Sequence, residues 1–308
     1  MGRPTEVRVR VPASSANLGP GFDSLGLALG LYDEIEVTAL PSDGVHVEVT
    51  GEGAGQVPCD GSHLVVQAMR TAWAAFGDAP AGLRLRCHNA IPHSRGLGSS
   101  AAAAVAGAVA AAVLAGREPD LERETLLQVT AGMEGHADNA AASLLGGFVV
   151  AWEEHRPSSG GCGNIPARFH AVRLDVHDGI RPVALVAGVE SSTKTTRGLL
   201  PESVPLVDAA FTGSRTALSV LAFTQRPELL MAATEDRLHQ GYRRPAYPES
   251  ADLVDSLRAH GIPATISGAG PTVLALTADG KLPTALDLHG FSVMPLPVDT
   301  SGALVEIG

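Results

Sequence analysis

A glycine- and serine-rich segment, IPHSRGLGSSAA at residues 91–102, runs directly into a long stretch of alanine and valine. Alanine is the strongest helix former, so the stretch predicts a helix that begins at this segment. The free N–H groups and the positive dipole end of a helix N-terminus attract phosphate. The segment therefore predicts a phosphate-binding loop, in which the Ser99 and Ser100 hydroxyls face a phosphate oxygen or Mg²⁺. The alternative is a plain loop before a buried helix, which needs one glycine cap rather than both Gly96 and Gly98.

The loop differs from three widespread motifs. No lysine precedes Lys194, which excludes a phosphate loop of the GxxxxGK[ST] type. The Gly19-Pro20-Gly21 segment breaks the spacing of the GxGxxG dinucleotide fingerprint. No GxSxG nucleophile elbow occurs, which argues against an α/β-hydrolase.

Composition narrows the class of protein. With 308 residues and 45% apolar content, the chain can form one large or two medium domains. A net charge of −11 gives no electrostatic support for a nucleic-acid partner. Cys59, Cys87 and Cys162 form no CxxC pair, the start of the chain has no apolar signal region, and residues 101–115 are too short to span a membrane. We expect a cytoplasmic protein without a membrane partner.

The hydrophobic pattern mixes strands and helices without regular βαβ alternation, which predicts an α+β protein in two lobes. Residues 13–23 read as a loop, and the proline- and glycine-rich residues 157–166 as a linker between domains at 1–156 and 157–308. Strands are predicted at residues 7–11, 25–31, 33–39, 45–49, 83–87, 146–152, 170–174, 182–189 and 273–277. Helices are predicted at residues 63–76, 101–115, 122–133, 216–224, 227–238 and 250–260.

Two further segments concentrate polar side chains. In VPASSANLGPGFDSLG, residues 11–26, a Gly-Pro-Gly turn brings Asn17 and Asp23 together, although both could merely cap their own turn. In GMEGHADNAAASLLGG, residues 132–147, no zinc spacing occurs, and Glu134 is better suited to Mg²⁺ as a hard oxygen ligand. The alternative there is a polar turn between helices, with Asp138 or Asn139 as the N-cap.

These three segments, together with SGAGPTVLAL from Ser267, resemble the GHMP small-molecule kinases over residues 7–277. The resemblance implies an N-terminal domain related to domain 2 of ribosomal protein S5 and a ferredoxin-like C-terminal domain. It implies ATP as co-substrate and Mg²⁺ held by Ser100 and Glu134. It also implies nucleotide contacts at His63, Pro92, Ser94, Arg95, Gly96, Leu97, Gly98, Ser99, Ser100, Ala101, Ala102 and Lys194. Lys194 could instead be a solvated loop residue.

Residues 12–26 are most similar to the members of this family that phosphorylate the side-chain hydroxyl of L-homoserine. Homoserine is a zwitterion, so its ammonium needs an anion and its carboxylate suits the planar fork of arginine. The resemblance implies contacts with the amino acid from Asn17, Asp23, His136, Asn139, Arg197 and Arg243. Arg244 is the alternative to Arg243.

The resemblance also implies a catalytic group of Asn139, Thr193 and Arg197, with Thr193 near the γ-phosphate or the hydroxyl. Related sugar and mevalonate kinases have an aspartate base at the position of Asn139, which can only orient the hydroxyl. The hydroxyl proton would then pass to the γ-phosphate, directly or through water, and Asp23 would be a weak base at best. Family membership further suggests a homodimer that acts in threonine biosynthesis. The alternatives are a kinase for mevalonate or an isoprenoid precursor, and a non-catalytic ATP-binding protein.

Overall fold

The computed structural model describes residues 4–77, 79–154, 168–191 and 193–307, and the side chains of Thr193 and Lys194 lie outside the described part. The strands are β1 (Glu6–Asn17), β2 (Gly21–Leu40), β3 (Gly44–Gly51), β4 (Gly82–Asn89), β5 (Phe148–Glu154), β6 (Arg168–Leu174), β7 (Arg181–Ala187), β8 (Ala264–Ile266), β9 (Val273–Thr277), β10 (Phe291–Pro295) and β11 (Leu304–Ile307). The helices are α1 (Leu64–Phe76), α2 (Ser99–Leu114), α3 (Arg123–Glu134), α4 (Asp138–Leu145), α5 (Thr193–Arg197), α6 (Leu206–Thr224), α7 (Leu230–Ala233), α8 (Gln240–Arg243) and α9 (Pro248–Ala259). Short 3₁₀ turns occupy η1 (Pro227–Leu229) and η2 (Arg244–Ala246).

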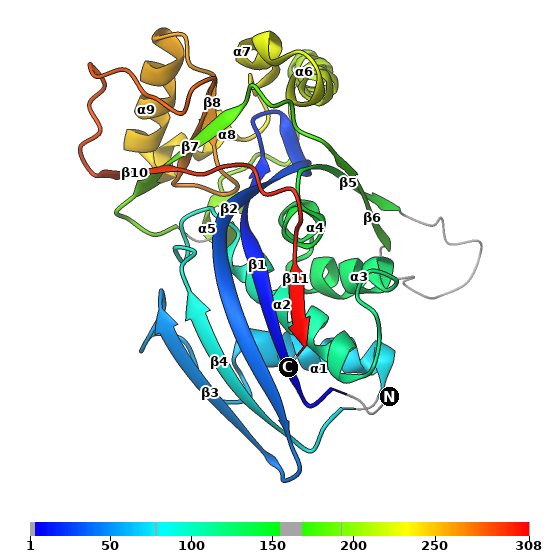
Figure 1. Cartoon of the computed structure of the whole chain (residues 1–308). Helices are drawn as coiled ribbons and strands as arrows, with labels where there is room; N and C mark the ends of the chain where they lie inside the picture. The colour runs from blue at the N-terminus through cyan, green and yellow to red at the C-terminus, as the bar shows by residue number, and fades with distance from the viewer. Residues whose placement is uncertain (1–3, 78, 155–167, 192, 308) are drawn as a thin grey trace.

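A seven-stranded sheet in the order β11-β1-β2-β4-β3 forms the first lobe, with β5 paired to β2 and β6 paired to β5. All of these pairings are antiparallel except that of β3 with β4. Two strands that follow residue 157, β6 and β11, thus belong to the sheet of the first lobe (Figure 1). The predicted halves 1–156 and 157–308 therefore share one sheet.

Strands β1 and β2 are longer than the sequence pattern predicts. Pro12 was expected to end the first strand, but it lies at a register shift between Pro12 and Ala13, where β1 continues. A β-bulge is one of the few places where a strand accommodates proline. Residues 13–17 form a buried strand instead of the predicted loop, and the two strands expected at 25–31 and 33–39 are a single strand, β2.

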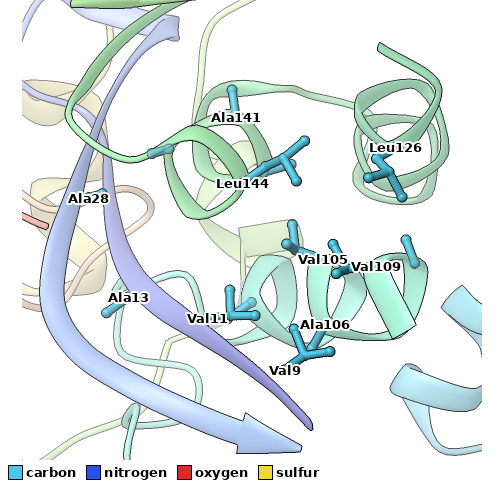
Figure 2. Close-up of a cluster of buried hydrophobic side chains, with 14 of the residues drawn as sticks. Val9, Val11, Ala13, Ala28, Val105, Ala106, Val109, Leu126, Ala141 and Leu144 are labelled. Carbon is cyan, nitrogen blue, oxygen red and sulfur yellow. The ribbon is translucent and has the colours of Figure 1, made fainter. Parts of the chain in front are cut away.

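Helices α1 to α4 cover one face of this sheet (Figure 1). The alanine-rich α2 is buried along almost its whole length, as the sequence predicts. Its small side chains permit close helix packing, and a Cβ on Gly107 would lie only 2.4 Å from the backbone oxygen of Val65. Figure 2 shows the resulting core, in which Val9 of β1 lies beside Ala106 of α2, and Val105 and Val109 of α2 point toward Leu144 and Leu126.

The second lobe contains an antiparallel four-stranded sheet in the order β10-β7-β9-β8. Helix α9 packs against β8 and β9, and its core includes Leu253, Leu257 and Ile266. Helix α6 begins ten residues earlier than predicted, and the helix predicted at 227–238 is only a 3₁₀ turn followed by the short α7. The architecture is the α+β fold that the sequence predicts. Within the described part of the chain, no helix has both the length and the apolar character needed to cross a bilayer.

Candidate active site

A cavity of about 440 Å³ lies at the N-terminus of α2, where three segments far apart in the sequence meet. These segments are the loop after β4, the residues around the start of α4, and the turn between β8 and β9. They line the cavity with Ser94, Gly96, Gly98, Ser99, Ser100, Glu134, His136, Asn139, Gly268, Ala269 and Gly270. A second cavity of about 380 Å³ adjoins the first, because Leu64, Ser94, Ser99 and Ser100 line both.

The loop before α2 has the backbone that a phosphate cradle requires. Gly96 and Gly98 adopt left-handed φ angles of 81° and 70°, a region that side chains other than glycine rarely enter. A Cβ on Gly96 would lie 2.4 Å from the Ser267 oxygen, and one on Gly98 would lie 2.1 Å from Ser14 Oγ. The glycines thus let the loop pack closely before α2, whose first amides have no intrahelical acceptor and whose Ser99 and Ser100 line the cavity.

The turn after β8 holds this loop against the N-terminal segment. The Ser267 hydroxyl contacts the Gly96 backbone oxygen at 2.6 Å and Ser15 Oγ at 2.8 Å. The Asn17 side-chain amide donates to the Gly268 oxygen at 2.9 Å, and the Gly268 amide donates to the Ala16 oxygen at 3.0 Å. Three motifs that the sequence singles out separately therefore form one hydrogen-bonded unit.

The residues predicted to contact the nucleotide divide into those that line a cavity and those that do not. Ser94, Gly96, Gly98, Ser99 and Ser100 line the first cavity, and His63 lines the second, where its Nδ1 accepts a hydrogen bond from the first turn of α1. The structure brings the side chains of the other described residues to neither cavity. These are Pro92, Arg95, Leu97, Ala101 and Ala102.

Burial or hydrogen bonding explains why the side chains of these five residues reach neither cavity. Pro92, Leu97, Ala101 and Ala102 are buried, so only their backbone could meet a ligand. Arg95 donates to the backbone oxygens of Ala187 and His93.

Glu134 and Ser100 both line the first cavity and carry oxygen atoms that could bind a metal ion. The Ser100 hydroxyl donates to Glu134 Oε1, and Glu134 Oε2 is buried without a partner among the described residues. Burial raises the pKa of the Glu134 carboxyl, and the Ser100 hydrogen bond opposes that rise. A carboxylate and a hydroxyl are hard oxygen donors, and Mg²⁺ is usually held by one or two carboxylates together with substrate phosphates. The donor set fits this metal.

Asn17 and Asp23 are adjacent, as the Gly-Pro-Gly turn predicts. The Asp23 backbone amide donates to Asn17 Oδ1 at 3.0 Å. Both residues have left-handed φ angles, 68° for Asn17 and 55° for Asp23. Such angles cost conformational energy in residues other than glycine and often occur at functional sites.

Asp23 forms an ion pair with Arg197, one of the two predicted arginines. Arg197 donates to both carboxylate oxygens of Asp23, at 2.6 and 3.0 Å. The guanidinium carbons of Arg197 and Arg243 each lie 5.3 Å from the centre of the Phe22 ring. Phe22 belongs to this group as well, although an aromatic residue in such a sequence gives no signal that distinguishes a binding role from packing.

Arg243, rather than Arg244, belongs to this group. The Arg243 side chain is 1% exposed, its Nε has no partner among the described residues, and burial lowers the pKa of its guanidinium. Arg244 is paired with Asp252 and Asp255 on the surface. A buried arginine without a carboxylate partner is costly unless an anion completes the site.

His136 and Asn139 line the first cavity, and hydrogen bonds to Asp138 hold both residues in place. The buried Asp138 accepts hydrogen bonds from His136 Nδ1 at 2.9 Å and from the Asn139 backbone amide at 2.8 Å. The hydrogen bond to Asp138 raises the pKa of His136. Neither Asp138 nor Asn139 is the N-cap of α4, which is Ala137 without a side-chain cap bond.

Asn139 Oδ1 accepts a hydrogen bond from the Ser14 hydroxyl at 3.0 Å, which leaves the amide nitrogen as the group available to a ligand. The sequence gives no local signal for Ser14 as its partner, because 125 residues separate the two.

Comparison with known proteins identifies the family. Family models described as GHMP kinases N terminal domain and GHMP kinases C terminal match residues 63–147 and 220–286. A homoserine kinase of Streptomyces avermitilis is 52% identical over 98% of this chain and 96% of its own length. One from Rhodococcus erythropolis is 55% identical over 95% of this chain and 93% of its own length.

Solved structures agree with this result. The crystal structure of homoserine kinase from Cytophaga hutchinsonii superposes with a TM-score of 0.81 at 25% identity, covering 99% of both chains. The chain belongs to the homoserine kinases, within the GHMP kinase family.

Proposed function

We propose that this chain transfers the γ-phosphoryl group of ATP to the side-chain hydroxyl of L-homoserine, which yields O-phospho-L-homoserine and ADP in threonine biosynthesis. One observation carries the proposal. An acid and two arginines suited to a small zwitterion, Asp23, Arg197 and Arg243, gather around Phe22, and Asn17 connects Asp23 to the Gly268 turn that lines the cavity of the lysine-free phosphate loop. The kinase relatives at 52% and 55% identity support it.

In this proposal the loop holds the ATP phosphates through the first amides of α2 and the hydroxyls of Ser99 and Ser100. The adjoining cavity, which His63 lines, receives the nucleoside. Ser100 and Glu134 would hold Mg²⁺, which neutralises charge on the β- and γ-phosphates when it is bound. We propose Lys194 as a further nucleotide contact and Thr193 as a contact near the γ-phosphate.

When the amino acid binds, its two charged groups replace the ion pair between Asp23 and Arg197. Its ammonium takes the place of the Arg197 guanidinium beside Asp23, and its carboxylate takes the place of Asp23 beside Arg197 and also contacts Arg243. Asn17 fixes the Asp23 backbone, so the acid is held in place during this exchange. His136 completes the side of the site next to the cavity.

Transfer requires alignment more than a base. The amide nitrogen of Asn139 donates to the homoserine hydroxyl oxygen, which attacks the γ-phosphorus in line with the departing bridge oxygen of ADP. The P–O bond to ADP breaks as the new one forms, and the hydroxyl proton passes to a γ-phosphate oxygen, directly or through water. Phosphoryl transfer depends mainly on positioning and charge neutralisation, so a neutral amide is sufficient here.

A homoserine-dependent ADP-release assay tests the function, with mevalonate at matched ATP as the competing substrate. The expected result is turnover with homoserine and none with mevalonate. Turnover with mevalonate alone would assign the chain to the other kinase class, and ATP binding without any turnover would make it a non-catalytic binding protein.

We also infer a cytoplasmic homodimer without a nucleic-acid partner. The dimer rests on the family resemblance, and the absence of a nucleic-acid partner rests on the net charge of −11. Light scattering of the purified protein at several concentrations tests the dimer, and a constant monomer mass would reject it.

A further inference from the structure

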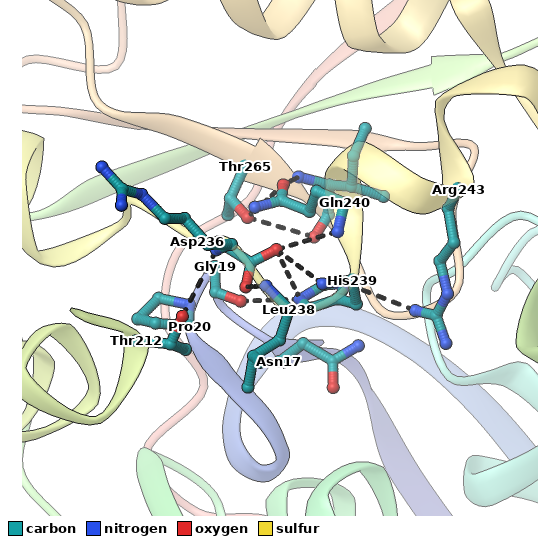
Figure 3. Close-up of polar contacts among 12 residues, drawn as sticks. Asn17, Gly19, Pro20, Thr212, Asp236, Leu238, His239, Gln240, Arg243 and Thr265 are labelled. Atoms are coloured by element: carbon teal, nitrogen blue, oxygen red, sulfur yellow. Dashed lines mark hydrogen bonds and ion pairs between the residues drawn. The ribbon is translucent and has the colours of Figure 1, made fainter. Parts of the chain in front are cut away.

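The buried Arg243 guanidinium is held by one imidazole. Arg243 Nη1 contacts His239 Nδ1 at 3.3 Å, and the two residues lie one helical turn apart (Figure 3). The Phe22 ring lies 5.3 Å from both the guanidinium carbon and the His239 ring centre. Because arginine has no acceptor, this contact requires Nδ1 of His239 to accept.

The other nitrogen of the His239 ring contacts the turn that precedes β2. His239 Nε2 lies 2.7 Å from the Gly19 backbone oxygen, which can only accept, so Nε2 carries the proton. Gly19 belongs to the turn before β2, and Asp23 lies near the start of that strand. His239 thus connects the arginine expected to bind the substrate carboxylate with the segment that carries the acid expected to bind its ammonium.

The ring itself is fixed by a buried carboxylate. Asp236 accepts hydrogen bonds from the backbone amides of Leu238, His239 and Gln240 at 2.8, 3.1 and 2.8 Å. Its Oδ2 lies 3.6 Å from His239 Nε2, and both side chains are fully buried. Burial lowers the pKa of His239, which favours the neutral tautomer that both contacts require.

We propose that His239 is a positioning residue for the amino-acid site, which orients Arg243 through Nδ1 and anchors the Gly19–Asp23 segment through Nε2. The proposal rests on the function proposed above. In it, one rigid ring sets the separation between the carboxylate site and the ammonium site, and so favours a zwitterion of a particular length.

Two substitutions separate the two contacts. His239→Gln places an amide nitrogen near the position of Nε2 and removes the acceptor for Arg243, whereas His239→Asn places an oxygen near Nδ1 and removes the donor to Gly19. We expect each to raise the KM for homoserine by roughly tenfold or more, since hydrogen bonds to charged or buried groups are involved. The KM for ATP and kcat should stay within about threefold, because neither contact reaches the phosphate loop.

A double-mutant cycle with Arg243→Ala tests whether His239 acts through Arg243. His239→Gln should add no further rise in the homoserine KM to that variant, whereas His239→Asn should still add one through the Gly19 turn. A full, additive effect of His239→Gln, an unchanged homoserine KM, or an equal rise in both KM values would overturn the proposal.

Thr265→Val is the matched control. The Thr265 hydroxyl donates to Gln240 Oε1 at 3.0 Å and to the Ile266 oxygen at 3.3 Å in the same buried cluster, and these hydrogen bonds involve neither His239 nor Arg243. Its homoserine KM should equal that of the wild type, and a rise as large as that of His239→Gln would indicate general loosening and reject the positioning role. If His239→Gln does not fold, His239→Asn decides the question, since an unchanged homoserine KM there rejects the Gly19 contact. Absence of homoserine turnover by the wild type would instead reject the proposed function itself.

Discussion

Asp23 and Arg197 are 174 positions apart in the chain, yet they form an ion pair through both carboxylate oxygens. Each side chain neutralises its partner now, and we expect each to pair with the opposite charge of the substrate when the substrate binds. A ligand that carries only one charge would leave one member of the pair without a partner. This relationship favours a zwitterion over a simple acid or amine.

Asp23→Asn should raise the KM for homoserine. The substitution keeps the size of the side chain but removes the anion for the ammonium, and a hydrogen bond to a charged group contributes about 1.5–3 kcal/mol, roughly 10- to 150-fold in affinity. The KM for ATP should not change. Steady-state kinetics with each substrate varied in turn measures both constants, and an effect confined to ATP would contradict the assignment.

Arg243→Ala should raise the KM for homoserine by a similar factor, whereas Arg244→Ala should leave the kinetics unchanged. Arg243 is buried beside Phe22, and Arg244 is paired with two surface carboxylates. Exposed ion pairs contribute little to stability, so Arg244→Ala should fold normally. Equal effects of the two substitutions would show that the buried position of Arg243 has no role in substrate binding.

Glu134→Gln should reduce kcat by roughly 100-fold or more, since a metal ion contributes several kcal/mol of charge stabilisation in the transition state. Some affinity for ATP should remain, because the loop amides are intact. The Mg²⁺ concentration at half-maximal activity should rise. An unchanged Mg²⁺ dependence of the rate would reject the metal role of Glu134.

Gly98→Ala should weaken ATP binding and destabilise the protein. The new Cβ would lie 2.1 Å from Ser14 Oγ, at a left-handed φ of 70°. Gly132→Ala is the control, since this glycine lies in α3 with no heavy atom within 4 Å of a new Cβ. It should stabilise the protein by about 0.5–1 kcal/mol. Denaturant unfolding and ATP titration of both variants check the contrast.

The buried His239 should make stability fall as the pH falls below about 6.5. Its folded pKa is lowered by burial, so in this window the unfolded chain binds a proton that the folded chain does not. One such group contributes at most about 1.4 kcal/mol per pH unit. The difference between the unfolding free energies at pH 7.5 and 5.5 should be smaller in His239→Gln, and an equal difference in both proteins would contradict the prediction.

Local chemistry predicted the phosphate loop and the long α2 because glycine, serine and alanine act through the backbone of neighbouring residues. The same reasoning failed for residues 13–17, whose small side chains read as a loop. Ala13 and Ser14 are instead fully buried in β1, where α2 and α4 pack against the strand. Packing between distant segments outweighed local propensity there.

The contacts of the amino-acid site could not be predicted from the sequence, because they join residues that are far apart in the chain. His239 and Gly19 are 220 positions apart, and a histidine next to a glutamine carries no signal for a partner in the first lobe. The resemblance predicted Arg197 and Arg243, but only the folded chain shows that both guanidinium groups lie near the Phe22 ring.

Strand β11 pairs with β1 at the edge of the first sheet, and β6 extends that sheet beyond β5. Separate expression of the two halves, divided at residue 156, would leave β1 and β5 each with an unpaired edge. Exposed edges of this kind promote aggregation. A split version of this enzyme should therefore recover activity only when both fragments are refolded together.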